Sequence, residues 1–345
     1  MRRPFVTVIL ISSIAAGMFY PYRALGIAAF TEFPLPTSQA APHSITLGAD
    51  GNLWFTEADV DQIGRMTPAG VVDEFLTPSL FVGVEDIILG ADGNLWFTES
   101  FANQIGRITP QGTIVEFPIP TASSFPQGIA SGADGSLWFT EAFANQIGRI
   151  TTTGVVSEYS VPTAASYPLY IAAGPDGALW FTEADADKIG RITTAGVVNE
   201  FSLSTAGSYP SGITAGPGNT LWFVEADVDQ IGRITTAGAI TQFALPNPLS
   251  TPERIVLGPD GALWFTEMDA AQLGRITTAG VIMEVALPSS DSSPTGIAVG
   301  PDGGLWVTDT TADQIISYGP VVAATATPSQ KPTATATLAA TPTRT

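Results

Sequence analysis

Residues 44–75 decide the fold, and they read SITLGADGNLWFTEADVDQIGRMTPAGVVDEF. Four short runs rich in apolar and β-branched residues occur here, at 44–48, 53–57, 62–67 and 71–75. An Asp-Gly pair separates the first two runs and a Pro-Ala-Gly sequence separates the last two. No run shows helical periodicity or is long enough for a core helix. The stretch therefore predicts four short antiparallel strands joined by turns.

The same pattern recurs along most of the chain and is marked by tryptophan. The chain has seven tryptophans, each 42 residues from the next, at Trp54, Trp96, Trp138, Trp180, Trp222, Trp264 and Trp306. A period near 40 with four strands in each unit is typical of β-propeller blades. The sequence therefore predicts an all-β chain, a seven-bladed β-propeller of 42-residue, four-stranded blades.

The two ends of the repeat array predict how the ring closes. Phe33 lies 42 residues before Phe75, so residues 31–36 carry an additional copy of the fourth strand. The last unit lacks this strand, because Thr327 occupies the position of the next aromatic residue. We expect the N-terminal strand to complete the seventh blade, which leaves no unpaired sheet edge. The propeller is expected to span residues 29–320.

The segments outside the repeats indicate an extracytoplasmic protein. Arg2 and Arg3 precede an apolar run at 5–20, and small residues follow it, so residues 1–28 are predicted to be a secretory signal peptide. An uncleaved N-terminal membrane anchor is the alternative. Residues 321–345 are rich in Thr, Ala and Pro and predict a disordered tail that suits an extracellular spacer. We expect a secreted or cell-surface protein.

Composition excludes several classes of partner and chemistry. The 345 residues include 32 acidic and 13 basic side chains, for a formal net charge of −19. Nucleic acids and anionic membranes are therefore poor partners, because phosphate binding needs a basic face. The absence of cysteine excludes disulfides, thiolate catalysis and zinc-thiolate sites. We expect a monomer that binds a small molecule or another extracellular ligand.

A residue found in every blade cannot by itself define a single site, so repeated features belong first to the scaffold. We expect the tryptophans to pack between neighbouring blades rather than to stack on sugars. The Asp-Gly pairs are expected to form type I′ turns rather than calcium loops. A cross-strand ion pair is predicted between the Glu that ends each second strand and the Arg of the third, as in Glu57 and Arg65. Blade seven changes both, to Asp309 and Ser317.

Departures from the repeat point to one face of the disc. The start of each first strand and the end of each second strand share this face, which is the acidic one. Two residues at the start of each first strand, which we call the collar, vary between blades: His43-Ser44, Glu85-Asp86, Gln127-Gly128, Leu169-Tyr170, Ser211-Gly212, Glu253-Arg254 and Thr295-Gly296. The ligand contacts expected at the mouth of the central channel are Glu85, Asp86, Gln127, Tyr170, Glu253 and Arg254.

The units GADGNLWFTE, NQIGRITP and GPDGALWFTEADADKIGRITTAG resemble the virginiamycin B lyase (streptogramin lyase) family of seven-bladed propellers, over about residues 30–318. The resemblance implies a magnesium-dependent lyase that opens cyclic depsipeptide antibiotics by elimination, an antibiotic-resistance activity. A His removes a Cα proton beside an ester carbonyl that the metal polarises, and the ester oxygen leaves. The family uses histidines at the Pro-His-x-Ile position of two neighbouring blades. It also uses a Glu two residues before one of them and the Glu that ends that blade's second strand.

Only part of this set is present. By the resemblance, His43 is the catalytic base and Glu57, which we expect it to face, is the metal ligand. The other Glu is replaced by Ala41, and the companion His by Thr295.

The opposite pairing of blades, with His43 as the companion, fits no better. It puts Glu85 at the position of the catalytic His and Gly83 at that of the metal Glu. His43 is the only histidine of the chain, so no choice of blades provides both imidazoles.

Three hypotheses of function follow. We favour a secreted binding or interaction module with a degenerate lyase site. The alternative is an active carbon-oxygen lyase that uses Mg²⁺ and His43 as its base. A third hypothesis is a calcium-dependent lactonase that uses the carboxylates of Glu85, Asp86 and Glu253 around the channel.

Overall fold

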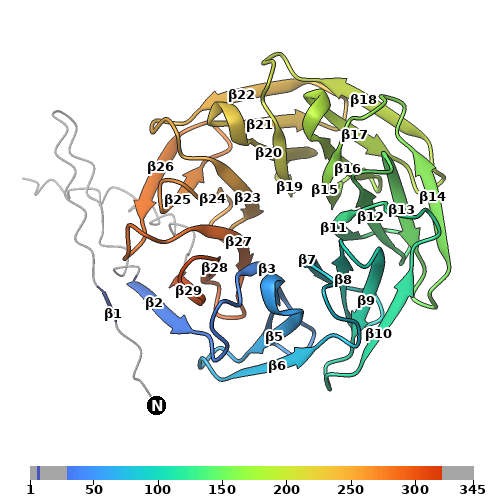
Figure 1. Ribbon diagram of the computed structural model, residues 1–345. Helices are drawn as coiled ribbons and strands as arrows, with labels where there is room; N and C mark the ends of the chain where they lie inside the picture. The colour runs from blue at the N-terminus through green and yellow to red at the C-terminus, as the bar shows by residue number, and fades with distance from the viewer. Residues whose placement is uncertain (1–5, 8–28, 321–345) are drawn as a thin grey trace, which may run out of the picture.

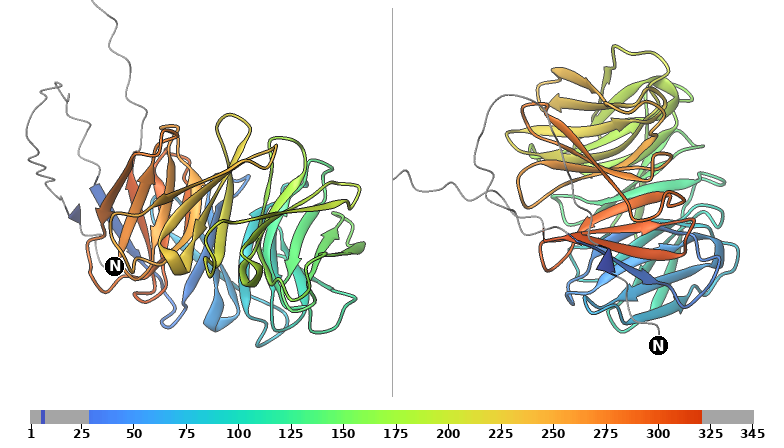
Figure 2. Two further views of the ribbon diagram at one scale, coloured as in Figure 1. Left: turned by 90° about the horizontal axis from the view of Figure 1, so that it is seen from above. Right: turned by 90° about the vertical axis from the view of Figure 1, so that its left-hand side faces the viewer.

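Seven antiparallel sheets surround a central channel, and each corresponds to one copy of the repeat (Figure 1). The computed structural model describes residues 6–7 and 29–320, and the predicted all-β, seven-bladed architecture is confirmed there. Seen edge-on, the strands run between the two faces of the disc (Figure 2). Apart from residues 6–7, the predicted signal peptide and the predicted tail at 321–345 lie outside the described residues. No helix in the described ranges is long and apolar enough to cross a membrane.

The blades are numbered here by their tryptophans, from Trp54 in blade one to Trp306 in blade seven. The first strands line the channel: β3 (Pro42–Leu47), β7 (Val84–Leu89), β11 (Pro126–Ser131), β15 (Pro168–Ala173), β19 (Pro210–Gly216), β23 (Pro252–Leu257) and β27 (Pro294–Val299). The second strands are β4 (Leu53–Glu57), β8 (Leu95–Glu99), β12 (Leu137–Glu141), β16 (Leu179–Glu183), β20 (Thr220–Glu225), β24 (Leu263–Glu267) and β28 (Leu305–Asp309).

The outer half of each blade follows the same order. The third strands are β5 (Gln62–Met66), β9 (Gln104–Ile108), β13 (Gln146–Ile150), β17 (Lys188–Ile192), β21 (Gln230–Thr235), β25 (Gln272–Ile276) and β29 (Gln314–Gly319). The fourth strands are β6 (Val72–Leu76), β10 (Ile114–Pro118), β14 (Val156–Ser160), β18 (Val198–Ser202), β22 (Ile240–Ala244), β26 (Ile282–Ala286) and β2 (Ala29–Pro34). Short 3₁₀ turns follow three second strands: η1 (Ala58–Val60), η2 (Ala184–Ala186) and η3 (Ala226–Val228).

Blade seven takes its fourth strand from the N-terminal part of the chain. β2 pairs with β29 along its whole length, from Ala29 opposite Gly319 to Pro34 opposite Gln314. In Figure 1 the blue β2 accordingly lies beside the red β29. The two-residue strand β1 (Val6–Thr7) pairs with the other edge of β2. The predicted closure of the ring by the N-terminal strand is confirmed.

The tryptophans pack between blades, as predicted. Trp54 is fully buried and shares a core cluster with Val84, Leu95 and Phe97 of blade two. Its other neighbour is Phe75 of its own blade, whose ring stacks on it at a centroid distance of 5.8 Å. Each tryptophan therefore links the outer strand of its own blade to the core of the next.

The expected type I′ geometry of the Asp-Gly turns is wrong. Gly51 has a φ of +76°, whereas Asp50 is not among the residues with positive φ. The Gly51 amide donates to the Gly48 carbonyl at 3.1 Å, which marks a three-residue loop with a left-handed glycine. Asp50 is needed for its side chain, because Oδ1 accepts hydrogen bonds from the Asn52 amide and from the Trp54 indole, both at 3.1 Å.

The predicted ion pair between Glu57 and Arg65 is also wrong. In the register of β4 and β5, Arg65 lies opposite Trp54 and Glu57 lies opposite Gln62. Side chains alternate along a strand, so the two charges lie on opposite faces of the sheet. The Arg65 guanidinium packs 5.5 Å from the Trp54 ring centroid and pairs with Asp73 at 2.5 Å. Glu57 is left inside the blade without a cation.

One steric pair explains a second departure of blade seven from the repeat. Gly64 lies opposite Phe55, and a Cβ atom at Gly64 would come within 2.1 Å of that ring. In blade seven the glycine is replaced by Ile316 and the phenylalanine opposite it by Val307. A larger residue on one strand is thus matched by a smaller one on the other, which keeps the core filled.

Candidate functional site

A ring of threonine hydroxyls fixes the backbone of the collar. The threonine before the last residue of each second strand recurs in six blades, as Thr56, Thr98, Thr140, Thr182, Thr266 and Thr308. Thr98 Oγ1 accepts a hydrogen bond from the Asp86 amide at 3.1 Å and donates to the Gln127 carbonyl of blade three at 2.7 Å. The strand register shifts at each collar, so these bonds satisfy backbone groups that the sheet leaves unpaired. The 42-residue recurrence of this threonine was a signal that sequence reasoning did not use.

Blade five lacks this threonine and compensates within its own collar. Val224 occupies the threonine position, and the Ser211 hydroxyl instead donates to the Glu253 carbonyl of blade six at 3.3 Å. The carbonyl that a threonine would satisfy thus keeps a hydrogen-bond donor.

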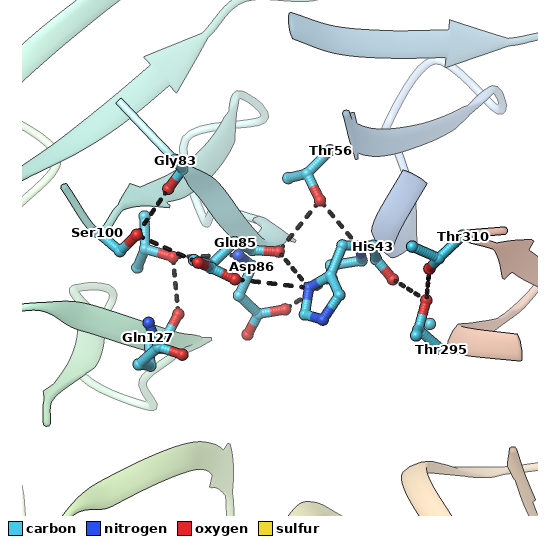
Figure 3. Close-up of polar contacts among 12 residues, drawn as sticks. His43, Thr56, Gly83, Glu85, Asp86, Ser100, Gln127, Thr295 and Thr310 are labelled. Atoms are coloured by element: carbon cyan, nitrogen blue, oxygen red, sulfur yellow. Dashed lines mark hydrogen bonds and ion pairs between the residues drawn. The ribbon is translucent and has the colours of Figure 1, made fainter. Parts of the chain in front are cut away.

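His43 lies at the start of β3 and turns toward blade two (Figure 3). Its Nδ1 is 3.2 Å from the Glu85 carbonyl oxygen and 3.8 Å from the Glu85 carboxylate. Glu85 is held in turn by the Ser100 hydroxyl, which donates to Oε1 at 3.1 Å. The tautomer that donates from Nδ1 to the carbonyl leaves Nε2 as a basic nitrogen. The His43 and Glu85 side chains are each 22% exposed, so solvent and solutes reach this pair.

Glu57 is not beside His43, contrary to the expectation that the two face each other. Thr56 donates to the Glu85 carbonyl of blade two, so the next side chain, that of Glu57, points away from blade two. Glu57 is completely buried, and neither carboxylate oxygen has a hydrogen-bond partner. Burial raises its pKa to about 8, and the charges of Glu74 and Asp313 add to this.

The positions of the missing family residues serve the seam between blades seven and one. Thr295 is buried, and its hydroxyl lies 3.2 Å from the His43 carbonyl and 2.9 Å from the Thr310 hydroxyl. The Ala41 amide donates to Asp313 Oδ1 at 3.1 Å, with a φ of +47°. Both positions therefore hold blades seven and one together.

The magnesium site implied by the resemblance does not fit these residues. Glu57 is enclosed within its blade, and Ala41 has no oxygen in its side chain. Within residues 29–320 no group of three or more His, Asp or Glu side chains is arranged to hold a metal ion. Mg²⁺ needs several oxygen ligands in near-octahedral geometry, which this donor set does not offer.

Four of the predicted ligand contacts bind one another instead and form a polar layer across the channel: Asp86, Tyr170, Glu253 and Arg254. The Arg254 guanidinium lies 3.7 Å from the Tyr170 ring centroid, and Nη2 is 3.2 Å from Asp86 Oδ1. Burial lowers the pKa of Arg254, but Asp86, Tyr170 and Glu253 together outweigh this, so the net shift is upward and the guanidinium stays charged. Burial also raises the pKa of Tyr170 well above its usual value, and its hydroxyl donates to Glu253 Oε1 at 3.0 Å. The layer thus links blades two, four and six.

The predicted contacts differ in their access to solvent. Asp86 also accepts hydrogen bonds from the Ser44 hydroxyl at 2.6 Å and the Ile129 amide at 2.9 Å. Gln127 is buried, whereas Glu85 and Glu253 are partly exposed. The three carboxylates of the lactonase hypothesis are thus each hydrogen-bonded to protein groups, and the exposed ones are Glu85 and Glu253.

A cavity of about 350 Å³ occupies the channel next to this layer. Asp86 and Arg254 line it, together with a ring of seven isoleucines, one from each blade: Ile45, Ile87, Ile129, Ile171, Ile213, Ile255 and Ile297. The isoleucine ring is apolar, whereas the partly exposed pair of His43 and Glu85 offers polar groups to solutes at the mouth.

Comparison with known proteins identifies one family. The profile of the Virginiamycin B lyase family matches residues 26–172 and 159–336. A streptogramin B lyase structure is 39% identical, with a TM-score of 0.81 over 84% of this chain and 97% of that chain. Virginiamycin B lyase from Staphylococcus aureus is 40% identical, with a TM-score of 0.81 over 84% of this chain and 98% of that chain.

A catalytically inactive form of the Staphylococcus aureus enzyme, solved with quinupristin, is also similar. It is 40% identical, with a TM-score of 0.80 over 84% of this chain and 98% of that chain. Among curated protein sequences there is no match to the chain.

Proposed function

Because the chain belongs to the virginiamycin B lyase family, we propose that it is an extracytoplasmic ligand-binding propeller of that family in which the lyase site is degenerate. The observation that carries the proposal is the separation of His43 from Glu57, which lie toward different neighbouring blades. Elimination needs a base on the Cα proton and, at the same substrate, a group that polarises the ester carbonyl. His43 supplies the first, whereas Glu57, which was expected to hold the polarising metal, is completely buried.

One observation favours the alternative of an active lyase. The Glu85 carbonyl and carboxylate both lie near His43 Nδ1, an arrangement that orients the imidazole and leaves Nε2 free to accept a proton. An active chain would use His43 to remove the proton, with Glu85 as the residue that positions the ring.

The mass of the product separates these functions. The purified mature protein is incubated with a type B streptogramin, with and without Mg²⁺, and the antibiotic is followed by chromatography and mass spectrometry. We expect unchanged antibiotic in every sample. Elimination would yield an opened product of unchanged mass, and hydrolysis would add one water. An opened isomer that is absent with His43→Ala would overturn our proposal and establish the lyase.

A further inference from the structure

Four aromatic side chains form a strip on the face that carries His43. Phe101 follows β8 and Phe143 follows β12, while Phe125 and Tyr167 immediately precede β11 and β15. The ring centroids of successive members lie 5.7, 4.3 and 6.0 Å apart, from Phe101 through Phe125 and Phe143 to Tyr167. The strip therefore runs without a break across blades two, three and four.

Two members of the strip are exposed to an extent that folding does not explain, while Phe125 and Tyr167 are half-buried. Phe101 is 71% exposed and Phe143 is 64% exposed, so neither contributes a buried face to a blade. Contiguous exposed aromatic surface on a soluble protein marks an interaction site more often than isolated apolar residues do. The strip begins beside the candidate site, because Ser100, next to Phe101, donates a hydrogen bond to Glu85.

The repeat itself shows that these aromatics are departures rather than scaffold. The position of Phe101 and Phe143 is aspartate in four other blades, namely Asp59, Asp185, Asp227 and Asp269. The position of Phe125 and Tyr167 is small or polar in four blades, namely Ala41, Gly83, Thr251 and Ser293. Other blades of the same chain thus form without aromatic rings at these positions.

The surroundings of the strip are anionic. The Asp185 amide donates to the Ser166 carbonyl at 3.1 Å, so Asp185 lies at the Tyr167 end of the strip, and the Ser100 hydrogen bond holds Glu85 at the Phe101 end. After the larger effect of burial, the charges of both carboxylates raise the pKa of Tyr167. Tyr209 of blade five is affected in the same way by Asp185 and Glu253, after burial and Tyr167. Arg254 near this face is already paired with Asp86. An aromatic surface edged by carboxylates attracts a ligand that has both cationic and aromatic groups.

We propose that the aromatic strip binds a peptide or peptide-like segment that alternates basic and aromatic side chains. The strip suits an extended segment because it spans three blades, and its aromatic side chains offer both stacking and cation–π contacts. The inference rests on the proposed function, since it names the ligand class of the same face.

The test uses the full mature protein and a fluorescein-labelled pentapeptide, Arg-Phe-Arg-Phe-Arg, in an anisotropy titration. Two matched peptides replace Arg by Glu or Phe by Ser. We expect the Arg-Phe peptide to bind more tightly than either by about tenfold or more, and its binding to weaken as salt is added. Equal binding of the Arg-Phe and Glu-Phe peptides would overturn the proposal.

Variants place the binding on the strip. Phe143→Ala is expected to weaken peptide binding about tenfold, and Asp185→Asn to reduce both affinity and salt dependence. The control variant is Val197→Ala. Val197 is an apolar residue of similar exposure, 58%, in the turn before β18 on the opposite face. We expect this variant to bind the peptide as tightly as the wild type does. An unchanged affinity in Phe143→Ala overturns the proposal, as does binding to zwitterionic lipid vesicles in place of the peptide.

The failure of each proposal is visible separately. Cleavage of the streptogramin would refute the proposal of a degenerate lyase site, but it would not change the result of the peptide titration. Absence of peptide binding to the wild type would refute the proposed role of the strip, but it would not change the result of the cleavage assay.

Discussion

Six buried glutamates are expected to make the stability of the ring depend on pH. They end the second strands of blades one to six and are completely buried: Glu57, Glu99, Glu141, Glu183, Glu225 and Glu267. In blade three, burial raises the pKa of Glu141 from 4.5 to about 8, and the charge of Glu158 on the outer strand adds to this. At neutral pH the folded chain therefore holds a proton on Glu141 that the unfolded chain releases.

The sign of the effect follows from this difference. A folded pKa above the unfolded one stabilises the fold fully below pH 4.5, and the stabilisation is lost as pH rises toward about 8. Within this window each such proton makes the free energy of unfolding fall by about 1.4 kcal/mol per pH unit. Over 2.5 pH units, from pH 5 to pH 7.5, one glutamate accounts for roughly 3 kcal/mol.

The variant Glu141→Gln isolates one of these protons, because the amide is neutral at every pH and has nearly the same shape. Urea unfolding of the wild type and the variant is compared at intervals between pH 5 and pH 7.5. We expect the wild type to lose about 3 kcal/mol relative to the variant over this range. Curves that run parallel would refute the reasoning, since Glu141 would then titrate alike in both states.

A second variant uses an arrangement already present in the ring. In blade five the outer acid is replaced by Gln242, whose amide donates to Glu225 Oε2 at 2.7 Å, and the pKa of Glu225 is raised only to about 7. Glu158→Gln reproduces this arrangement in blade three. The pH dependence contributed by Glu141 should then end about one pH unit lower than in the wild type.

Two further predictions concern ring closure and the polar layer. Deletion of residues 1–36 removes β2 and exposes an edge of β29, so we expect a clearly lower melting temperature in a thermal scan, and an unchanged one would contradict the closure. Arg254→Met leaves Asp86 buried without its cation and is expected to cost about 3 to 5 kcal/mol in urea unfolding. The double variant with Asp86→Asn should recover part of this loss, and a loss equal to the sum of the single variants would show that the two charges do not interact.

The blade count and the closure could be predicted because they depend only on spacing. A 42-residue period leaves one solution for the number of units, and the phase of Phe33 assigns the N-terminal strand to blade seven. The face on which a side chain lies could not be predicted in the same way. The register of β4 and β5 places Arg65 opposite Trp54. A shift of this register by one residue would have put Arg65 on the same face of the sheet as Glu57.

The collar illustrates the same difficulty within the candidate site. Sequence reasoning placed His43 and Glu85 at the collar, and the two side chains are in fact neighbours there. It also assigned Asp86, Tyr170 and Arg254 to a ligand, although these side chains bind one another across the channel. Contacts between blades two, four and six depend on the curvature of the ring and on the bulge at each collar, and neither leaves a periodic signal in the sequence.

Departures from the repeat fall into two kinds, and one of them can be tested within blade five. Val307 with Ile316, and Val224 with Ser211, are compensated substitutions that preserve packing or hydrogen bonding. Ser211→Ala should therefore cost about 1 to 2 kcal/mol, because the Glu253 carbonyl loses its donor. In a Val224→Thr background the threonine hydroxyl donates to the Glu253 carbonyl, as the Thr98 hydroxyl donates to the Gln127 carbonyl. Ser211→Ala should then change the free energy of unfolding by close to nothing. An equal cost in both backgrounds would show that Ser211 does not replace the missing threonine, and the blade-five collar would then join the aromatic strip among the departures that the scaffold does not explain.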